Sequence, residues 1–191
     1  MILGSHNSWS YLPSKKWWMS PFKFTAKCQD VDIYHQYFDY NVRCFDLRVR
    51  FNKKGELILA HGSMEYKYSK HYILLDLAFL NSKKDVYIRI LHEVRNKKQY
   101  SEISKSKFIE FCEEIKNKFP NLKFWCGRNL YNWEIDYKFD IEPSCEEKYS
   151  SVCSPKLIDD WYPRLYAKRN NSKLKTDKEI LLIDFVNYYK L

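Results

Sequence analysis

Two histidines and a charged pair carry the chemistry that this sequence can perform. His6 lies in a Gly-Ser-His-Asn-Ser turn after a short apolar segment, and His61 ends a second apolar segment. Between them, Asp46 and Arg48 are separated by one residue in a strand-like segment. One imidazole can accept a proton from an attacking hydroxyl, the other can protonate a leaving oxygen, and an arginine can hold a phosphate between them. These residue types therefore indicate phosphoryl transfer by acid-base catalysis.

The three segments, in this order, resemble the X region of phosphatidylinositol-specific phospholipases C. In that family the first segment reads like Pro-Gly-Thr-His-Asp/Asn-Ser, which residues 3–8 match except at Leu3 and Ser5. The third is a short strand that ends in His-Gly, as residues 57–62 do. In the second, an acidic residue and a spacer precede arginine in metal-independent bacterial enzymes and aspartate in calcium-dependent eukaryotic ones. The Asp-Leu-Arg sequence at residues 46–48 is similar to the bacterial type.

The resemblance implies a role for each residue of the acid-base set. His6 is the general base on the inositol 2-hydroxyl, and His61 protonates the glycerol oxygen as it leaves. Arg48 neutralises the phosphate charge where a calcium ion otherwise sits, so neither a metal nor a cofactor is expected. Asp46 points the same way as Arg48 and either holds that arginine or forms a simple structural ion pair. Asp184 interrupts a late apolar segment and either orients His6 or pairs with a barrel arginine.

Four more residues are expected to contact the substrate. Asn7 replaces the aspartate that arginine-containing relatives usually place beside the acid histidine, and its amide can still reach the phosphate or the 2-hydroxyl. Asp160 and Tyr162 match a family Asp-x-Tyr segment, in which the carboxylate binds an inositol hydroxyl and the ring stacks on the sugar. Arg89 alternates with apolar neighbours and is therefore expected to face the barrel interior, as can Glu93.

The loop after the first strand carries a feature suited to membranes. Trp17 and Trp18 are adjacent and follow two lysines. Tryptophan rings favour the interface of a bilayer, where lysine amines meet lipid phosphates. Bacterial members of the resembled family use an aromatic residue there to dock on membranes. The alternative is that one of the two rings packs beneath the first helix.

Length and charge favour one basic domain, residues 1–191. A chain of this length buries roughly 70% of its unfolded surface, which allows a real core. The 33 Lys and Arg residues against 24 Asp and Glu residues give a net charge of +9, which favours polyanions or an anionic bilayer surface. No apolar run reaches the ~18–20 residues that span a bilayer, and no secretory segment precedes the first motif. We therefore expect a soluble, cytoplasmic monomer that is peripheral at membranes.

The six cysteines show neither a Cys-x-x-Cys pair nor the spacing of a Cys/His metal site. We expect them to be reduced packing residues.

Alternating strand-like and helix-like segments must position the reacting side chains. Alternation of this kind favours a parallel sheet with helical crossovers. The turn at residues 52–55 makes the second and third strands an antiparallel hairpin or a sharp reversal. The predicted strands are residues 2–5, 43–51, 57–60, 86–91, 122–126, 156–159 and 180–186, and the predicted helices are residues 31–40, 70–80 and 104–118.

A full eight-stranded barrel needs ~250 residues, with ~200 as the lower edge. The resemblance therefore implies an α/β fold that is a small, irregular or incomplete TIM (β/α) barrel, with loops in place of crossovers in residues 127–155. In such barrels functional groups gather at the carboxyl ends of the strands. Six predicted site residues fall at or near such ends: His6, Asp46, Arg48, His61, Asp160 and Asp184.

Three functions compete. The leading one is a metal-independent phosphodiesterase that cleaves phosphatidylinositol, or a related anionic phospholipid, to diacylglycerol and inositol 1,2-cyclic phosphate. A glycerophosphodiester or sphingomyelin-type phosphodiesterase would need a carboxylate metal site, against which Arg48 argues. A non-catalytic module that binds acidic lipid is the third possibility. Nucleic acid is not an expected partner, because no motif that reads RNA or DNA is visible.

Overall fold

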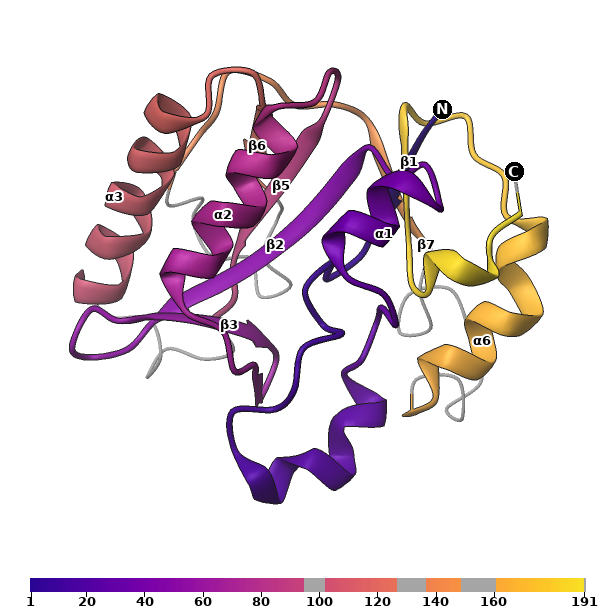
Figure 1. Cartoon of the computed structure of the whole chain (residues 1–191), viewed down its shortest axis with the longest axis horizontal. Helices are drawn as coiled ribbons and strands as arrows, with labels where there is room; N and C mark the ends of the chain where they lie inside the picture. Colours follow the sequence, from indigo (N-terminus) through magenta and orange to yellow (C-terminus); the bar gives the residue numbers. More distant parts are fainter. Residues whose placement is uncertain (95–101, 127–136, 149–160, 191) are drawn as a thin grey trace.

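The structure is a computed structural model, and it describes residues 1–94, 102–126, 137–148 and 161–190. These residues form one curved mixed sheet, with helices along one face and short helical segments beyond the strand ends (Figure 1). The eight strands are β1 Ile2–Ser5, β2 Cys44–Phe51, β3 Leu57–His61, β4 Met64–Glu65, β5 Tyr87–His92, β6 Lys123–Cys126, β7 Cys145–Lys148 and β8 Ile180–Ile183.

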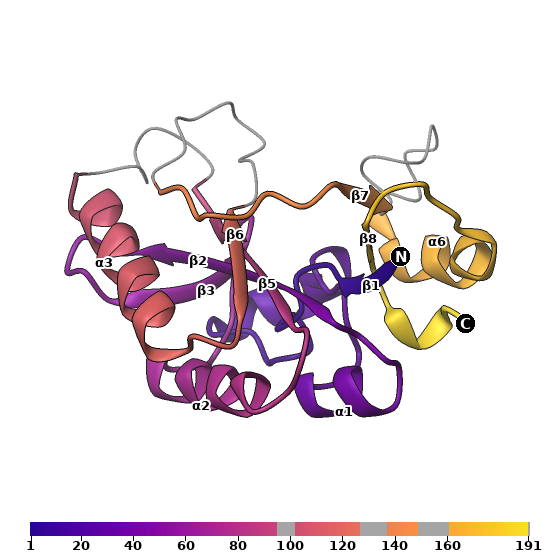
Figure 2. The same cartoon turned by 90° about the horizontal axis from the view of Figure 1, so that it is seen from above.

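The helical elements include three α-helices that lie along one side of the sheet, namely α1, α2 and α3 (Figure 2). A fourth, α6, lies beside β8 and the N-terminal strand (Figure 2). Their bounds are η1 Trp17–Thr25, α1 Ile33–Phe38, α2 Lys70–Asn81, α3 Glu102–Lys118, α6 Pro163–Asn170, η2 Asn171–Lys173 and η3 Val186–Tyr188.

The strand order makes the sheet an incomplete (β/α) barrel. Six strands run parallel in the order β7-β8-β1-β2-β5-β6, while β3 and β4 add an antiparallel extension next to β2. Within the described residues, β6 and β7 do not pair, so the sheet curls without closing. This confirms the fold class that the sequence predicted.

The side chains of the central strand β2 point alternately to the hydrophobic core and into the barrel interior. All eight of its residues are buried, although they alternate between apolar and polar types. Phe45, Leu47 and Val49 belong to the main core, which also contains the apolar faces of α2 and α3. Side chains alternate across a strand, so Asp46 and Arg48 point to the opposite face, into the barrel. The same period that builds the core therefore delivers charged groups to the interior.

Gly4 allows the strand that carries His6 to approach its neighbours closely. A Cβ at this position would lie 2.7 Å from Cδ1 of Leu182 on β8 and 3.1 Å from Cβ of Cys44 on β2. A larger residue would force these three strands apart, which would displace the turn that follows β1.

Most predicted elements are confirmed, with shifts of one or two residues at their ends. The 52–55 turn joins β2 to β3 as an antiparallel hairpin, with Gly55 at a φ of 76°. The strand predicted at residues 180–186 ends at Ile183, because Phe185 adopts a left-handed conformation with a φ of 49°. The helix predicted at residues 31–40 is shorter, since the side chain of Asp32 caps its start.

The elements that were not predicted include β7 and α6, and one prediction lies outside the described residues. β7 occurs in the 127–155 region that was expected to be loops, which corrects that expectation at residues 145–148. Helix α6 was not anticipated either. The strand predicted at residues 156–159 lies outside the described part of the chain. No helix among the described residues is long and apolar enough to cross a membrane.

Candidate active site

The turn after β1 is fixed to β2 by a set of short hydrogen bonds. Ser8 Oγ donates to the Ser5 carbonyl at 2.8 Å and accepts from the backbone N–H of Asp46, also at 2.8 Å. Asn7 has a φ of 44°, which suits asparagine better than most residues. In this conformation its backbone N–H donates to the Asp46 carboxylate at 2.9 Å. The turn thus places His6 over the barrel interior in one defined position.

His6 and Asp184 form a buried pair at the carboxyl ends of β1 and β8. The His6 Nδ1 atom lies 2.7 Å from Asp184 Oδ1, and both side chains are almost fully buried. Asn171 supports the strand end by donating to the backbone carbonyl of Asp184 at 2.7 Å. Gln29 does the same for His6, whose carbonyl accepts from Gln29 Nε2 at 3.1 Å. Of the two alternatives for Asp184, the geometry matches the contact with His6.

Protonation of this pair is governed by burial. Burial lowers the pKa of His6 well below its usual range, and the nearby charges of Arg48, His61 and Arg89 lower it further. Burial also raises the pKa of Asp184 to about 8, against the opposing effects of a Cys28 hydrogen bond and the Arg48 charge. At neutral pH the imidazole of His6 is therefore neutral, as a general base requires, and the Asp184 carboxyl keeps most of its proton until the pH rises above about 8.

Asp46 lies at the centre of a charge network on the barrel floor. Its Oδ2 atom accepts from Arg48 Nε at 2.7 Å, and its Oδ1 atom lies 3.5 Å from Arg89 Nη1. Arg89 also pairs with Glu147 of β7, so this ion pair links the two sides of the incomplete barrel. Burial alone would raise the pKa of Asp46, but Arg48, Arg89 and the N–H of Asn7 outweigh it and hold that pKa below its usual value. Asp46 is therefore an ionised anchor for two arginines.

His61 faces His6 across the site. The two ring centroids are 5.4 Å apart, and the rings are nearly perpendicular at 82°. His61 Nδ1 lies 3.0 Å from the Ala26 carbonyl, which leaves Nε2 as the ring nitrogen for chemistry. Glu93 braces the same region, since it accepts from the backbone N–H of Gly62 at 2.8 Å and lies 3.5 Å from Arg48 Nη1.

The electrostatics of His61 result from opposing neighbours. Burial and the Arg48 charge lower its pKa, while Glu93, the Ala26 carbonyl and Asp46 act to raise it. The net direction is downward. His61 therefore gains its proton most readily when an additional anion, such as a phosphate, enters the site.

Sequence reasoning missed Cys28, which lies in the site instead of in the core. Its Sγ atom is 3.8 Å from His61 Nδ1, and the side chain is buried. The residue comes from the loop between η1 and α1, which shows no periodicity or motif that could have revealed it. Tyr66 was missed for a similar reason: it accepts from the Asn7 side chain at 3.3 Å and donates to Ala26 at 3.0 Å. Cys44 and Cys112 are buried as the packing prediction requires, whereas Cys126 and Cys145 are half-buried.

One set of side chains among the described residues has donor atoms close enough to hold a metal ion. These are His6, Cys28 and Asp184, whose donor atoms all lie within 4.8 Å of one another. Burial and the neighbouring Asp184 raise the pKa of the Cys28 thiol well above its usual range. His6 contacts Asp184 at 2.7 Å and Cys28 hydrogen-bonds to Asp184, so the three side chains already form a hydrogen-bonded cluster.

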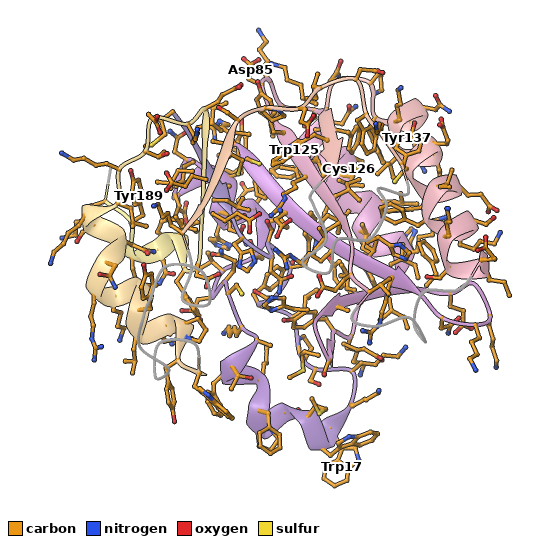
Figure 3. All side chains as sticks on the ribbon, turned by 180° about the vertical axis from the view of Figure 1, so that it is seen from behind. Trp17, Asp85, Trp125, Cys126, Tyr137 and Tyr189 are labelled. Carbon is orange, nitrogen blue, oxygen red and sulfur yellow. The ribbon has the colours of Figure 1, made fainter. Side chains whose placement is uncertain are left out.

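The remaining predicted site residues lie outside this cluster. Asp160 is outside the described residues. Tyr162 is 43% exposed, and its ring stacks on Phe24 of η1 at 5.3 Å, so its predicted contact with a sugar stays a prediction. Trp17 and Trp18 are 81% and 55% exposed at the end of the molecule where η1 projects (Figure 3). Neither ring is buried beneath a helix, which removes that alternative.

His92 faces away from the site, as its position on β5 predicts. Its ring stacks on Phe108 of α3 at 4.5 Å, and its Nε2 atom lies 3.0 Å from Ser104 Oγ. It is therefore a packing residue, in contrast to Arg89 on the other face of the same strand.

An incomplete (β/α) barrel with polar groups at the carboxyl ends of its strands is an architecture typical of enzymes. The particular fold is that of phosphatidylinositol-specific phospholipase C. The structure of a mutant of this enzyme from Staphylococcus aureus aligns with this protein over 100% of this chain and 91% of the mutant's chain. The TM-score is 0.62 and the sequence identity is 15%. A second mutant of the same enzyme gives a TM-score of 0.66 with 14% identity, over 99% of this chain and 87% of the other.

A third structure, from work on the membrane binding of the S. aureus enzyme, gives a TM-score of 0.60 with 16% identity. It covers 100% of this chain and 92% of the other. No family model and no curated protein matches the sequence. At this level of identity the likeness is one of fold.

Proposed function

We propose that this protein is a metal-independent phosphodiesterase that cleaves a phosphatidylinositol-type phospholipid by His/His acid-base catalysis. The observation that carries the proposal is the pair of facing imidazoles, 5.4 Å apart, beside the buried Arg48. A phosphate between the two rings would lie within reach of a base, an acid and a cation. The shared fold with a phospholipase C supports the same reaction class.

His6 begins the reaction by accepting the proton of the inositol 2-hydroxyl at Nε2, because its Nδ1 atom is engaged with Asp184. The 2-oxygen forms a bond to phosphorus, and the bond between phosphorus and the glycerol oxygen breaks. His61 gives a proton to that oxygen from Nε2, since its Nδ1 atom is bound to Ala26. The products are diacylglycerol and inositol 1,2-cyclic phosphate, with the proton taken from the hydroxyl left on His6.

Arg48 stabilises the charge that develops on the phosphoryl oxygens. Asp46 and Glu93 hold its guanidinium in place, so little reorganisation is needed during the reaction. Asp184 orients the His6 ring through Nδ1 and, once ionised above about pH 8, stabilises the imidazolium that forms on His6, as the third member of a catalytic triad does. Asn7 and Arg89 border this space and are proposed to contact the substrate, together with Asp160 and Tyr162.

Trp17 and Trp18 are proposed to hold the enzyme on the bilayer that contains its substrate. Both rings are exposed on η1, the segment that leads directly to Ala26 and Cys28 in the site. The two rings contact each other edge to face at 6.1 Å, which presents a paired aromatic surface to the outside.

Product analysis tests the proposed function. Phosphatidylinositol vesicles treated with the protein in excess chelator should yield inositol 1,2-cyclic phosphate, identified by phosphorus NMR. Arg48→Ala should reduce the rate by about 10²–10³-fold, because a developing charge loses its fixed cation. Lys54→Ala, an exposed residue of the β2–β3 turn, is the control. A strict calcium requirement, or a linear phosphate as the first product, would contradict the proposal.

A further inference from the structure

A cavity outside the histidine site is lined by residues of η1 and α6, and the exposed Trp17 and Trp18 lie on the same η1 segment. Its volume is about 360 Å³, within the range of about 300–1,000 Å³ that is typical of pockets for small ligands. None of the proposed acid-base residues lines it. The lining residues are Lys23, Phe24, Lys27, Tyr162, Arg164, Leu165 and Phe185.

The wall of the cavity is aromatic and aliphatic. Phe24 stacks on Tyr162 with ring planes 18° apart, and the buried Phe185 closes the inner side. Phe24, Tyr162 and Leu165 nevertheless remain 45%, 43% and 40% exposed. Contiguous exposed apolar surface on a folded protein marks a binding site more often than chance, so this wall fits an apolar group of a ligand.

Among the described residues, the rim of the cavity carries more cations than carboxylates. Lys27 and Arg164 share a single carboxylate, Asp30, which lies 2.9 Å from Lys27 Nζ. Lys23 has no carboxylate within ion-pair distance in the described part of the chain, and its Nζ donates to the Tyr11 carbonyl at 2.9 Å. Counted over the part of the chain that the structure describes, three cations face one anion, an excess of two positive charges at the rim.

The surroundings of Lys23 disfavour its charged form. Burial lowers its pKa to about 8, the neighbouring Lys27 lowers it too, and Asp30 offsets only part of the effect. An anion bound beside Lys23 would stabilise the charged form and raise this pKa again.

We propose that this cavity binds one anionic phospholipid of the bilayer, with an acyl chain against Phe24 and Leu165 and the phosphate between Lys23 and Arg164. The apolar wall and the cationic rim match the two parts of such a molecule. The cavity also continues the surface of η1 that exposes Trp17 and Trp18, so a docked bilayer would reach it. The inference rests on the membrane docking of the proposed function, but on none of its chemistry.

Charge and shape are tested separately. In the double variant Lys23→Gln, Arg164→Gln, binding to phosphatidylcholine vesicles that contain phosphatidylglycerol should weaken by about tenfold or more. The matched control is Lys173→Gln, Lys175→Gln, which removes the same charge from exposed positions away from the cavity. General attraction to an anionic surface is about 1 kcal/mol per basic residue, so an equal loss in both double variants would overturn the proposal. Binding to pure phosphatidylcholine vesicles should be the same for all three proteins.

The apolar part is tested with dodecyl phosphate and inorganic phosphate in calorimetric titrations. The wild-type protein should bind dodecyl phosphate at least about tenfold more tightly, since burial of each methylene contributes ~0.8 kcal/mol. Leu165→Trp should fill the cavity and remove this preference without changing the charge. Equal affinity for the two probes, or an unchanged preference in Leu165→Trp, would overturn the proposal.

Cleavage of a soluble inositol phosphodiester separates this inference from the proposed function. The cavity variants should retain that activity, because they leave His6, His61 and Arg48 intact. If the wild-type protein does not cleave the soluble substrate, the proposed function fails while both binding experiments still decide the lipid site.

Discussion

The interior of the barrel and the edge formed by η1 and α6 differ in which side chains they bury and which they leave exposed. In the interior, charged groups are buried and each is held by another: Asp46 has no exposed surface, yet it contacts Arg48, Arg89 and the N–H of Asn7. At the edge, apolar groups are left exposed, as Trp17 at 81% shows most clearly.

The difference shows which region is complete by itself. Buried charges are costly unless they are paired, so the interior is built to keep one geometry before any ligand arrives. Exposed rings contribute little to the free energy of folding. They become stabilising only when a partner covers them and removes their apolar surface from water. We therefore expect changes in the interior to alter rates and pH profiles, and changes at the edge to alter binding to surfaces.

Among changes to the interior, loss of an imidazole should have the largest effect on turnover. His6→Ala and His61→Ala should each lower turnover by roughly 10²-fold or more, because each removes a proton-transfer group. Vesicle binding should not change. His35→Ala, on the exposed surface of α1, is the matched control and should keep full activity. Wild-type turnover in either site variant, measured on a soluble inositol phosphodiester, would contradict the acid-base assignment.

Asp184→Asn should lower activity and, at alkaline pH, raise thermal stability. Turnover above about pH 8 should fall at least about tenfold, since the imidazolium of His6 there loses its anionic partner. The inflection near pH 8 in kcat/KM, which follows from the pKa of about 8 for Asp184, should disappear. Asn187→Ala, on the same C-terminal segment, is a control and should retain that inflection.

The same variant should be more stable than the wild type at alkaline pH. Asp184 has a raised pKa in the folded state, so its contribution is favourable below the unfolded pKa of about 3.9 and is lost as the pH rises to about 8. Thermal unfolding at about pH 9 should therefore give a higher Tm for Asp184→Asn, by several degrees. A lower Tm there, with a normal pH profile, would mark Asp184 as a purely structural residue.

The interior could be predicted largely from the sequence because its geometry follows from strand periodicity. Asp46 and Arg48 occupy alternate positions of one strand, and His6 and His61 each lie at the end of an apolar segment, and the structure brings these four side chains close together. Cys28 could not be placed in this way. It reaches the site from an irregular loop, and no local pattern fixes the path of such a segment.

The elements that were missed have their stabilising contacts far away in the sequence. β7 has the sequence Cys-Glu-Glu-Lys, without the apolar alternation of a strand, and it is held by parallel pairing with β8 and by the ion pair from Glu147 to Arg89. Helix α6 is polar along most of its length, so it lacks the apolar periodicity from which the other helices were predicted. Only Tyr166 and Ala167 bury apolar side chains beyond its first residue, Pro163.

Loss of the two tryptophans should change binding and leave chemistry intact. Trp17→Ala, Trp18→Ala should weaken vesicle binding by about tenfold or more, because each inserted ring contributes ~1–3 kcal/mol. Cleavage of a soluble substrate and thermal stability should stay near wild type, since both rings are exposed. Tyr72→Ala, an exposed aromatic residue on α2, is the control. An equal loss of soluble-substrate activity would mean that η1 supports the site and does not dock.

The smallest expected effect is a shift in the pH profile when Glu93 loses its charge. Glu93 raises the pKa of His61 against the effects of burial and Arg48, so Glu93→Gln should lower that pKa further. A glutamine oxygen can still accept from Gly62, which preserves the local backbone contact. His61 donates only when protonated, and that fraction falls as the pH rises through its pKa.

One inflection of the kcat/KM profile should therefore move to lower pH in Glu93→Gln, while the inflection near pH 8 stays. At a fixed neutral pH the rate should change by less than about tenfold, because the residue tunes the acid without replacing it. Glu65→Gln removes a carboxylate that pairs with Arg50 and Lys16 instead, so its profile should match the wild type. If neither inflection moves in Glu93→Gln, the interior charge network does not set the protonation of His61, and its role reduces to holding Arg48 in place.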